Sequence, residues 1–383
     1  MLKRGRSNST FLVINSVAIF VLTSVIVITV IRYPSPAISK LIEDLDANEF
    51  FIHFLRSENH YFYSENSTNS DFSLTETAFT LATNIKMADV RTLLGRELPG
   101  FANYDTEIVV AGEGTDYTNL PFESPPPLEV LLKDREIAHE RLERIEEAEQ
   151  TENSNSIKEL APAKTTNGKE VVYIYQSHSW EAFAPLLKGV DDPDEAVSNN
   201  AKVNVIAVGS RLKEELTNRG IGVRHDQTNV TNALQQRNWD YNDSYTYSRE
   251  LVQEALAGNN DLNYLIDIHR DSQSREITTT TINGKPFARL FFVVGKEHKN
   301  YEENLNLAKE IHSLLEEKYP GISRGVFVKG KSQGNGVYNQ DLTDRALLLE
   351  FGGVENDLPE LYNSIEAFAE VFSEYYWKDA EDI

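Results

Sequence analysis

Cysteine is absent from this chain of 383 residues, and the sequence contains only two methionines and three tryptophans. Without cysteine the chain forms no disulfide bond and offers no thiolate as a nucleophile or as a metal ligand. A transition metal would therefore have to be held by histidine and carboxylate side chains. The eight histidines of the sequence are the first residues to consider for that role.

Basic residues are also scarce, because 37 lysines and arginines stand against 60 aspartates and glutamates and leave a net charge of -23. Such a chain repels a phosphate backbone and cannot gain the counterion release that drives binding to nucleic acids. We therefore expect neither DNA nor RNA as a partner.

Charged residues are missing from Phe11–Ile31, a run that as a helix would be roughly 30 Å long and would cross the hydrocarbon core of a bilayer. Three basic residues precede this run, and the positive-inside rule places them in the cytoplasm. The alternative is a cleavable signal peptide, but the run is long and no small-residue cleavage pattern follows it before Pro34. We predict a single-pass protein of the cell membrane, with a cytoplasmic tail at 1–10 and an uncleaved anchor at 11–31.

Composition divides the remaining chain into three parts. Residues 32–127 are mixed in character and predict short helices in a membrane-proximal region, which ends near the proline-rich stretch "FESPPPLEV". Residues 128–168 are rich in charge and weakly periodic, as expected of a helical spacer. In residues 169–383 short apolar runs alternate with helix-period segments, which predicts one larger extracytoplasmic domain.

This larger domain is predicted to have an α/β fold. Its apolar runs "VVYIYQ", "GVRH", "NYLIDIH", "ARLFFVVG" and "ALLLEFG" are short and rich in β-branched or aliphatic residues, as in buried strands. Segments such as "SYTYSRELVQEALAG" between them have helical periodicity. Strands that are apolar throughout indicate a mostly parallel sheet with helices on both faces.

Ionisable residues stand where three of these strands end. His178 and Glu181 follow the first strand, His269 lies in "DIHRD", and Glu350 lies in "LLLEFGG". Ligands of open α/β sheets bind outside the carboxyl ends of the strands, so we expect these side chains to converge. A catalytic zinc takes three such ligands and leaves a fourth position to water. His178, Glu181 and His269 supply this set, and Glu350 suits a general acid/base.

Several longer motifs accompany these strand ends. They are "LLGRELPGF", "GEGTDYTNLPFESPPP", "VGSRLKEELTNRGIGVRHD", "SYTYSRE", "DIHRD", "VYNQDL" and "LLLEFGG". Together they resemble the stage II sporulation protein P family, membrane-anchored peptidoglycan amidases and endopeptidases of endospore-forming bacteria. The resemblance implies a zinc N-acetylmuramoyl-L-alanine amidase fold, with two histidines and a glutamate as zinc ligands. By motif His178 and His269 match the histidines and Glu350 matches the catalytic glutamate, and we take Glu181 as the third ligand.

The end of the first strand departs from the family pattern. The family usually has Tyr-His-Thr-His there, whereas this chain has Tyr175, Gln176, Ser177 and His178. Glutamine thus replaces the earlier histidine. We take the later position, His178, as the ligand, because glutamine is an uncommon zinc ligand and the rest of the pattern is retained.

Four further polar residues are candidates for contacts with a substrate. Arg249 and Arg270 are suited to bidentate binding of a carboxylate, although arginines on helix faces and strand ends are more often partners in structural ion pairs. His225 ends a strand at the same edge of the sheet, where it either supports a ligand or lies at the surface. Asn339 belongs to a loop that we expect near the site.

The predicted function is zinc-dependent cleavage of the amide between N-acetylmuramic acid and L-alanine of the stem peptide, outside the cytoplasmic membrane. The resemblance also implies endopeptidase activity, a role in septal wall removal and engulfment during sporulation, and partnership with stage II sporulation proteins D and M. The alternative is a catalytically degenerate, membrane-tethered protein that binds wall or partners without hydrolysis. Gln176 permits this alternative, and the retained ionisable residues argue against it.

Protease added to intact protoplasts tests the predicted orientation. Residues 169–383 should be degraded, because the basic residues ahead of the apolar run keep the N-terminus in the cytoplasm. An antibody against the C-terminal part of the chain measures the loss, and a cytoplasmic protein of the same cells, which should survive, is the control. Complete protection of residues 169–383 would contradict the orientation.

Overall fold

The structure is a computed structural model that describes residues 107–121, 128–131, 135–155, 162–190, 192–330 and 334–380. These residues all lie within one compact unit. The predicted tail, the predicted anchor and most of the predicted membrane-proximal region lie outside the described residues. Among the helices that are described, none combines the length and the hydrophobicity needed to cross a bilayer.

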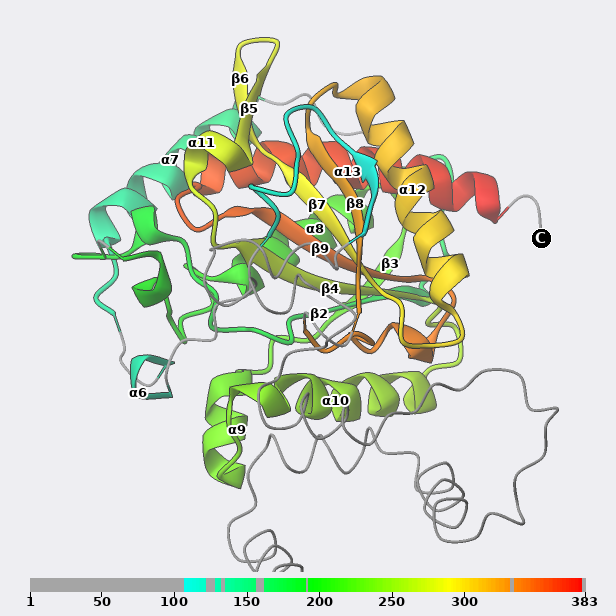
Figure 1. Cartoon of the computed structure of the whole chain (residues 1–383). Helices are drawn as coiled ribbons and strands as arrows, with labels where there is room; N and C mark the ends of the chain where they lie inside the picture. Colours follow the sequence, from blue (N-terminus) through cyan, green and yellow to red (C-terminus); the bar gives the residue numbers. More distant parts are fainter. Residues whose placement is uncertain are drawn as a thin grey trace, which may run out of the picture. The chain divides into compact units, whose positions relative to one another are not determined.

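A seven-stranded sheet with the order β1-β8-β7-β9-β4-β2-β3 forms the centre of the described structure (Figure 1). A separate hairpin consists of β5 and β6. The strands are β1 (Glu107–Ala111), β2 (Glu170–Tyr175), β3 (Gly222–His225), β4 (Tyr264–Asp271), β5 (Thr279–Ile282), β6 (Lys285–Ala288), β7 (Leu290–Gly295), β8 (Ser323–Lys329) and β9 (Ala346–Gly353).

The sheet is mostly parallel, as predicted, because four of its six strand pairs are parallel, and two antiparallel pairs make it mixed. Strands β9, β4, β2 and β3 are mutually parallel, as predicted. Strand β7, however, is antiparallel to β9, β8 is parallel to β7, and β1 is antiparallel to β8. Parallel neighbours need a long crossover, usually a helix. The chain instead reaches β7 through the β5–β6 hairpin, which returns it in the opposite direction.

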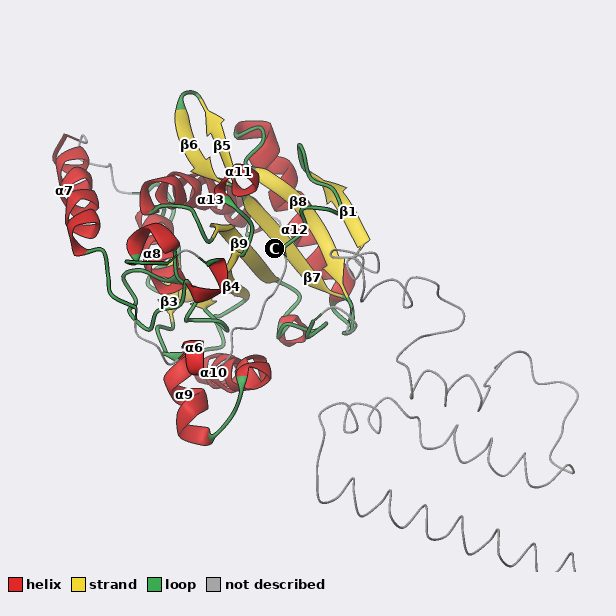
Figure 2. Cartoon of the chain, turned by 60° about the vertical axis from the view of Figure 1, so that its left-hand side comes forward, coloured by secondary structure: helices red, strands yellow, loops and turns green. Residues whose placement is uncertain are grey.

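Helices lie on both sides of the sheet (Figures 1 and 2). Helices α8 (Val205–Asn218), α12 (Tyr301–Lys318) and α13 (Leu358–Asp379) pack together on one face. Helix α10 (Ser244–Gly258) contacts β2 on the other face, with the short helix α9 (Val230–Arg237) beside it. The segment "SYTYSRELVQEALAG" forms helix α10, as its periodicity predicts, whereas periodicity does not predict α9 or strand β8.

Alternation along the strands assigns side chains to these two faces. In β2, Val172 and Ile174 enter the large core under α8 and α13, while Tyr173 and Tyr175 pack against residues of α10. In β4 the even-numbered apolar residues enter the large core. The odd-numbered residues share the α10 face, and from Asp267 onward they are polar. The α10 face therefore carries Asp267, His269 and Asp271 of β4.

Residues before position 169 complete this domain. Strand β1, from the predicted membrane-proximal region, pairs with β8 and forms one edge of the sheet. Helix α6 (Leu128–Leu131) and helix α7 (His139–Asn155) lie in the predicted spacer, and Leu142 and Ile145 of α7 join the large core. The region 169–383 thus packs with two segments that precede it.

A buried ion pair ties the segment after β1 to the centre of the sheet. Arg324 of β8 donates to the carboxylate of Asp271 at the end of β4, and both side chains are buried. The same guanidinium donates to the carbonyl of Asn119. Leu120, the next residue, packs among apolar side chains of β7, β8 and β9 on the α10 face.

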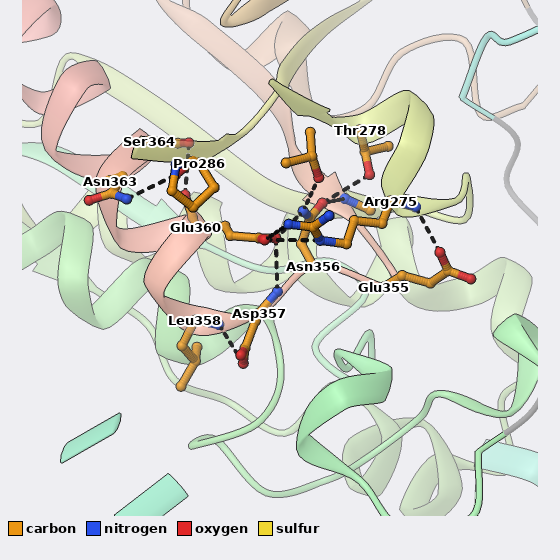
Figure 3. A network of polar contacts seen from close by, with 12 residues as sticks. Arg275, Thr278, Pro286, Glu355, Asn356, Asp357, Leu358, Glu360, Asn363 and Ser364 are labelled. Carbon is orange, nitrogen blue, oxygen red and sulfur yellow. Dashed lines mark hydrogen bonds and ion pairs between the residues drawn. The ribbon is translucent and has the colours of Figure 1, made fainter. Parts of the chain in front are cut away.

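The turn that follows Glu350 is fixed by the buried side chain of Asn356 (Figure 3). Its Oδ1 accepts hydrogen bonds from the amide of Gly353 at 2.7 Å and from Thr278 Oγ1 at 2.9 Å. Its Nδ2 donates to Glu360 Oε2 at 2.6 Å and to a threonine hydroxyl. Gly352 has a φ of +64°, and a Cβ there would come within 2.6 Å of Asn356 Oδ1. The last two residues of β9 are therefore glycines for steric reasons, since a Cβ on Gly353 would also come within 2.4 Å of the carbonyl oxygen of Gln273.

Substitution of Asn356 by alanine should lower the free energy of unfolding by roughly 2–4 kcal/mol, because the buried Gly353 amide and Glu360 carboxylate would lose a partner. Urea denaturation followed by circular dichroism measures this change. Asn363→Ala is the matched control, since Asn363 is half-buried and its side-chain amide donates to the carbonyl of Pro286 at 2.8 Å. Equal stability of the Asn356 variant and the parent would contradict this account of the turn.

Candidate functional site

Three neighbouring strands bring the predicted site residues to one edge of the sheet. His269 of β4 pairs in register with Glu350 of β9, so both side chains point to the α10 face. Strand β2 lies on the other side of β4, and the chain that leaves it carries His178 into the same place. A turn follows, in which the amide of Glu181 donates to the carbonyl of His178 at 3.1 Å.

His178, Glu181 and His269 form one compact group. The Glu181 carboxylate lies between the two rings, with Oε1 at 3.2 Å from His178 Nδ1 and Oε2 at 3.4 Å from His269 Nδ1. One ligand atom of each residue lies within 4.8 Å of the others. Both histidines are buried, and Glu181 is mostly so. The backbone amide of Arg270 also donates to Glu181 Oε2, at 3.0 Å, and fixes the carboxylate.

The charges of this group are strongly coupled. Burial alone would raise the pKa of the Glu181 carboxyl, but the charge of His269 and a hydrogen bond with His178 hold that pKa below its usual range. Burial likewise opposes the charged form of His269, yet the carboxylates of Asp267 and Glu181 raise its pKa well above the ordinary value. The carboxylates around His269 therefore favour a positive charge at this position.

Glu350 lies beside the group with a different electrostatic environment. Its side chain is almost fully buried, and within the described part of the chain its Oε2 has no hydrogen-bond partner. Burial raises the pKa of this carboxyl to about 8, with a further contribution from the negative charges of Glu181 and Asp271. A carboxyl of this kind can exchange a proton near neutral pH.

Aromatic rings surround His178. The ring centroids of Trp180, Tyr241 and Tyr245 lie at 4.9, 4.8 and 5.1 Å from that of His178. Tyr245 also stacks on His269 at 6.3 Å. Trp180 and Tyr245 are buried, so these rings enclose the group and restrict the access of water.

The group fits a zinc ion by its donors and by what they leave unsatisfied. Two imidazoles and one carboxylate match the ligand set of catalytic zinc. Among the described residues, Glu350 Oε2 is a buried polar atom without a hydrogen-bond partner, and so is His178 Nε2, the ring nitrogen that does not contact Glu181. Unpaired buried polar atoms are uncommon in folded proteins, and a bound ion or water is one way to satisfy them.

Gln176 and His225 lie away from this group. The side chain of Gln176 points toward α8, where a Cβ on Gly209 would come within 2.5 Å of its Nε2. Its Nε2 lies 3.0 Å from His225 Nε2. Burial lowers the pKa of His225 to about 4. Both residues therefore belong to the α8 side of the sheet, opposite the face that carries His269.

The other three candidates for substrate contacts have partners within the chain. Arg249 makes a bidentate ion pair with Asp341, at 2.7 and 2.6 Å. The guanidinium of Arg270 donates to backbone carbonyls, among them that of Ala182 at 3.0 Å. The side chain of Asn339 donates to the carbonyl of Tyr245 at 3.2 Å and so holds the start of α10. Each of these contacts positions a segment next to the site.

Two polar neighbours of His269 are absent from the residues that the sequence predicts for the site. Ser177 Oγ lies 2.9 Å from His269 Nε2, and Asp267 Oδ2 lies 3.3 Å from the same nitrogen. The available signal for Asp267 is its spacing, because residues two apart in a strand share a face. Ser177 carries no comparable signal, since its place depends on how the chain leaves β2.

The family model and the curated relative that match this chain carry the same description. A model described as stage II sporulation protein P matches residues 88–373. A curated relative, stage II sporulation protein P of Bacillus subtilis (strain 168), is 48% identical over 374 residues, which cover 97% of this chain and 91% of the relative. Among solved structures, Cwp6 from Clostridium difficile has a TM-score of 0.32 and 13% identity, over 55% of this chain and 30% of that chain. A TM-score this low supports no statement about function.

Full-length protein in detergent should bind about one zinc ion per chain, because the group offers a single three-ligand centre. His178→Ala and His269→Ala should each lose most of this zinc, measured by elemental analysis after dialysis, while circular dichroism stays unchanged. Gln176→Ala should keep its zinc, since that side chain lies on the opposite face of the sheet. Normal zinc content in both histidine variants would show that His178 and His269 are not zinc ligands. A loss of zinc in Gln176→Ala would show that Gln176 is needed for the metal and that His178 was wrongly chosen.

Proposed function

The chain belongs to the stage II sporulation protein P family, and we propose that it is a zinc-dependent peptidoglycan hydrolase that acts during sporulation. The observation that carries this proposal is the buried group of His178, Glu181 and His269 beside the carboxyl of Glu350. Zinc hydrolases combine such a ligand set with a separate proton-transfer group.

The proposed scissile bond is the amide between the lactyl group of N-acetylmuramic acid and L-alanine of the stem peptide. The motifs around the strand ends, which resemble the zinc amidases, support this choice. Cleavage of cross-links between stem peptides is proposed as a second activity. The same site can serve both reactions, because each is the hydrolysis of an amide.

The residues of the group have separate roles in this proposal. His178, Glu181 and His269 would hold zinc, which when bound polarises a carbonyl and lowers the pKa of its water to about 7. Glu350 would take a proton from the attacking water and deliver it to the leaving nitrogen. Burial raises the pKa of this carboxyl above its ordinary value, which suits both steps because a group that titrates closer to the working pH both accepts and releases protons.

The proposed location is the outer side of the cytoplasmic membrane. Support comes from the apolar run at residues 11–31 and from the basic residues ahead of it. Peptidoglycan lies on that side, within reach of a domain on a membrane tether. Stage II sporulation proteins D and M are proposed as partners in septal wall removal and engulfment, on the strength of the family resemblance.

The alternative is a catalytically degenerate member of the family that binds wall or partners. It depends on Gln176, which stands where the family usually has a histidine. Gln176 points toward α8 and contacts His225, whereas His178 lies within the buried group. This arrangement favours an intact site over a degenerate one.

Substitution of Glu350 by glutamine should abolish cutting without loss of metal. The variant should retain zinc and bind peptidoglycan, yet release stem peptides at a rate lower by on the order of 100-fold or more, as expected when a general acid/base is removed. Release is measured as new amino termini from purified peptidoglycan, and zinc is measured on the same sample.

Glu302→Gln is the matched control, since Glu302 is exposed on α12 and should be dispensable for activity. A Glu350→Gln protein that still releases stem peptides at close to the parental rate would contradict the proposed role of Glu350 in proton transfer. Zinc-loaded parent protein that binds peptidoglycan without cutting it would instead favour the degenerate alternative.

A further inference from the structure

His269 makes different contacts at its two ring nitrogens. Nδ1 faces Glu181, whose Oε2 lies at 3.4 Å, and therefore points into the proposed zinc group. Nε2 faces the opposite way, toward Ser177 Oγ at 2.9 Å and Asp267 Oδ2 at 3.3 Å. A metal that binds His269 would thus use Nδ1, and the proton of the ring would then reside on Nε2.

Ser177 and Asp267 form a continuous hydrogen-bonded chain behind His269. The Ser177 hydroxyl donates to Asp267 Oδ2 at 2.7 Å, and the Ser177 amide donates to Asp267 Oδ1 at 2.9 Å. Both side chains are buried, at 0% and 1% exposure. An ionised carboxylate only accepts hydrogen bonds, so the serine proton is committed to Asp267. The serine oxygen is then left to accept a hydrogen bond from His269 Nε2.

We propose that Ser177 and Asp267 are positioning residues that fix His269 in the Nε2-protonated tautomer and so leave Nδ1 free to bind metal. This inference rests on the proposed function, because it takes the zinc group as given. The outer partner of a metal-binding histidine determines its tautomer and its orientation. Here a serine relays that control from a carboxylate on the same strand as the histidine.

A merely structural role does not account for the whole arrangement. Tying the Ser177 amide to β4 needs only one acceptor atom, which a neutral asparagine also provides. A carboxylate as deeply buried as that of Asp267 is costly to desolvate unless its charge is compensated by a partner. A structural role does not explain the second oxygen, Asp267 Oδ2, which contacts both Ser177 Oγ and His269 Nε2.

Asp267→Asn should reverse the direction of the hydrogen bonds that link residue 267, Ser177 and His269, while the size and shape of the side chain at position 267 stay almost the same. The backbone amide of Ser177 requires an acceptor, so the carbonyl oxygen of the substituted side chain must stay there and its NH₂ group must face Ser177 Oγ. Ser177 then accepts from this NH₂ group and donates to His269 Nε2. The ring proton moves to Nδ1, where it blocks the metal. The expected result is a loss of zinc affinity of about 10- to 100-fold.

Ser177→Ala is the matched comparison. It removes the relay but leaves Asp267 Oδ2 at 3.3 Å from His269 Nε2, where the carboxylate can accept the ring proton directly. The tautomer is retained, so zinc affinity should change by less than about threefold, well below the usual loss for an outer partner. The double variant Ser177→Ala with Asp267→Asn should bind zinc more weakly than Ser177→Ala alone, because the side-chain NH₂ group of the asparagine then faces His269 Nε2.

The experiment measures zinc affinity of full-length protein in detergent by competition with a chelator. Long-range proton–nitrogen spectra of [15N]histidine-labelled, zinc-loaded parent protein should show the His269 proton on Nε2, assigned by its loss in His269→Ala. Circular dichroism and the melting temperature establish that each variant is folded. The parent spectrum decides the tautomer even where a variant does not fold.

Three outcomes would overturn the inference, and a fourth would support it. A ring proton on Nδ1 in the zinc-loaded parent would overturn the inference. A folded Asp267→Asn protein that binds zinc as tightly as the parent would overturn it as well, and would leave the proposed function standing. A parent that binds no zinc would overturn both. Weak zinc binding by Asp267→Asn together with near-parental binding by Ser177→Ala would support control of the tautomer by Asp267, because general damage to the site would lower both.

Discussion

In-register pairing of β4 with β9 is the constraint on which the site depends. It sets His269 opposite Glu350, and alternation along β4 places Asp267 and Asp271 on the same face. Because β2 runs parallel to β4 on its other side, the chain that leaves β2 brings His178 to this edge. A slip of one residue in either strand would turn these polar side chains into the apolar core under α8 and α13.

Burial makes the charges of this edge interdependent. Glu181 remains ionised against the effect of burial because the two histidines contact it, whereas Glu350 has no such partner among the described residues and its pKa rises. The two neighbouring carboxyl groups thus have pKa values that are shifted in opposite directions. This difference suits the proposed roles of Glu181 as a metal ligand and Glu350 as a proton-transfer group. The proposed zinc ion would add a positive charge where carboxylates already favour one.

The scaffold beyond the sheet edge holds this geometry from several directions. Asn356 fixes the turn after Glu350, and the Arg324–Asp271 pair joins the end of β4 to the segment that follows β1. Residues that precede the predicted catalytic domain therefore complete it: β1 closes one edge, and α7 adds to the large core. Composition suggested a boundary at residue 169, but hydrogen bonds and packing cross that point.

The sequence by itself determined the elements with strong local periodicity, such as α10 and the apolar strands, and it marked His178, His269 and Glu350 as residues at strand ends. Tertiary structure decided the direction of β7, which follows from a hairpin connection that hydrophobic periodicity does not reveal. It also decided that Gln176 points toward α8, and that Ser177 meets Asp267. These contacts join residues far apart in the chain, and only the register between neighbouring strands brings them within hydrogen-bonding distance.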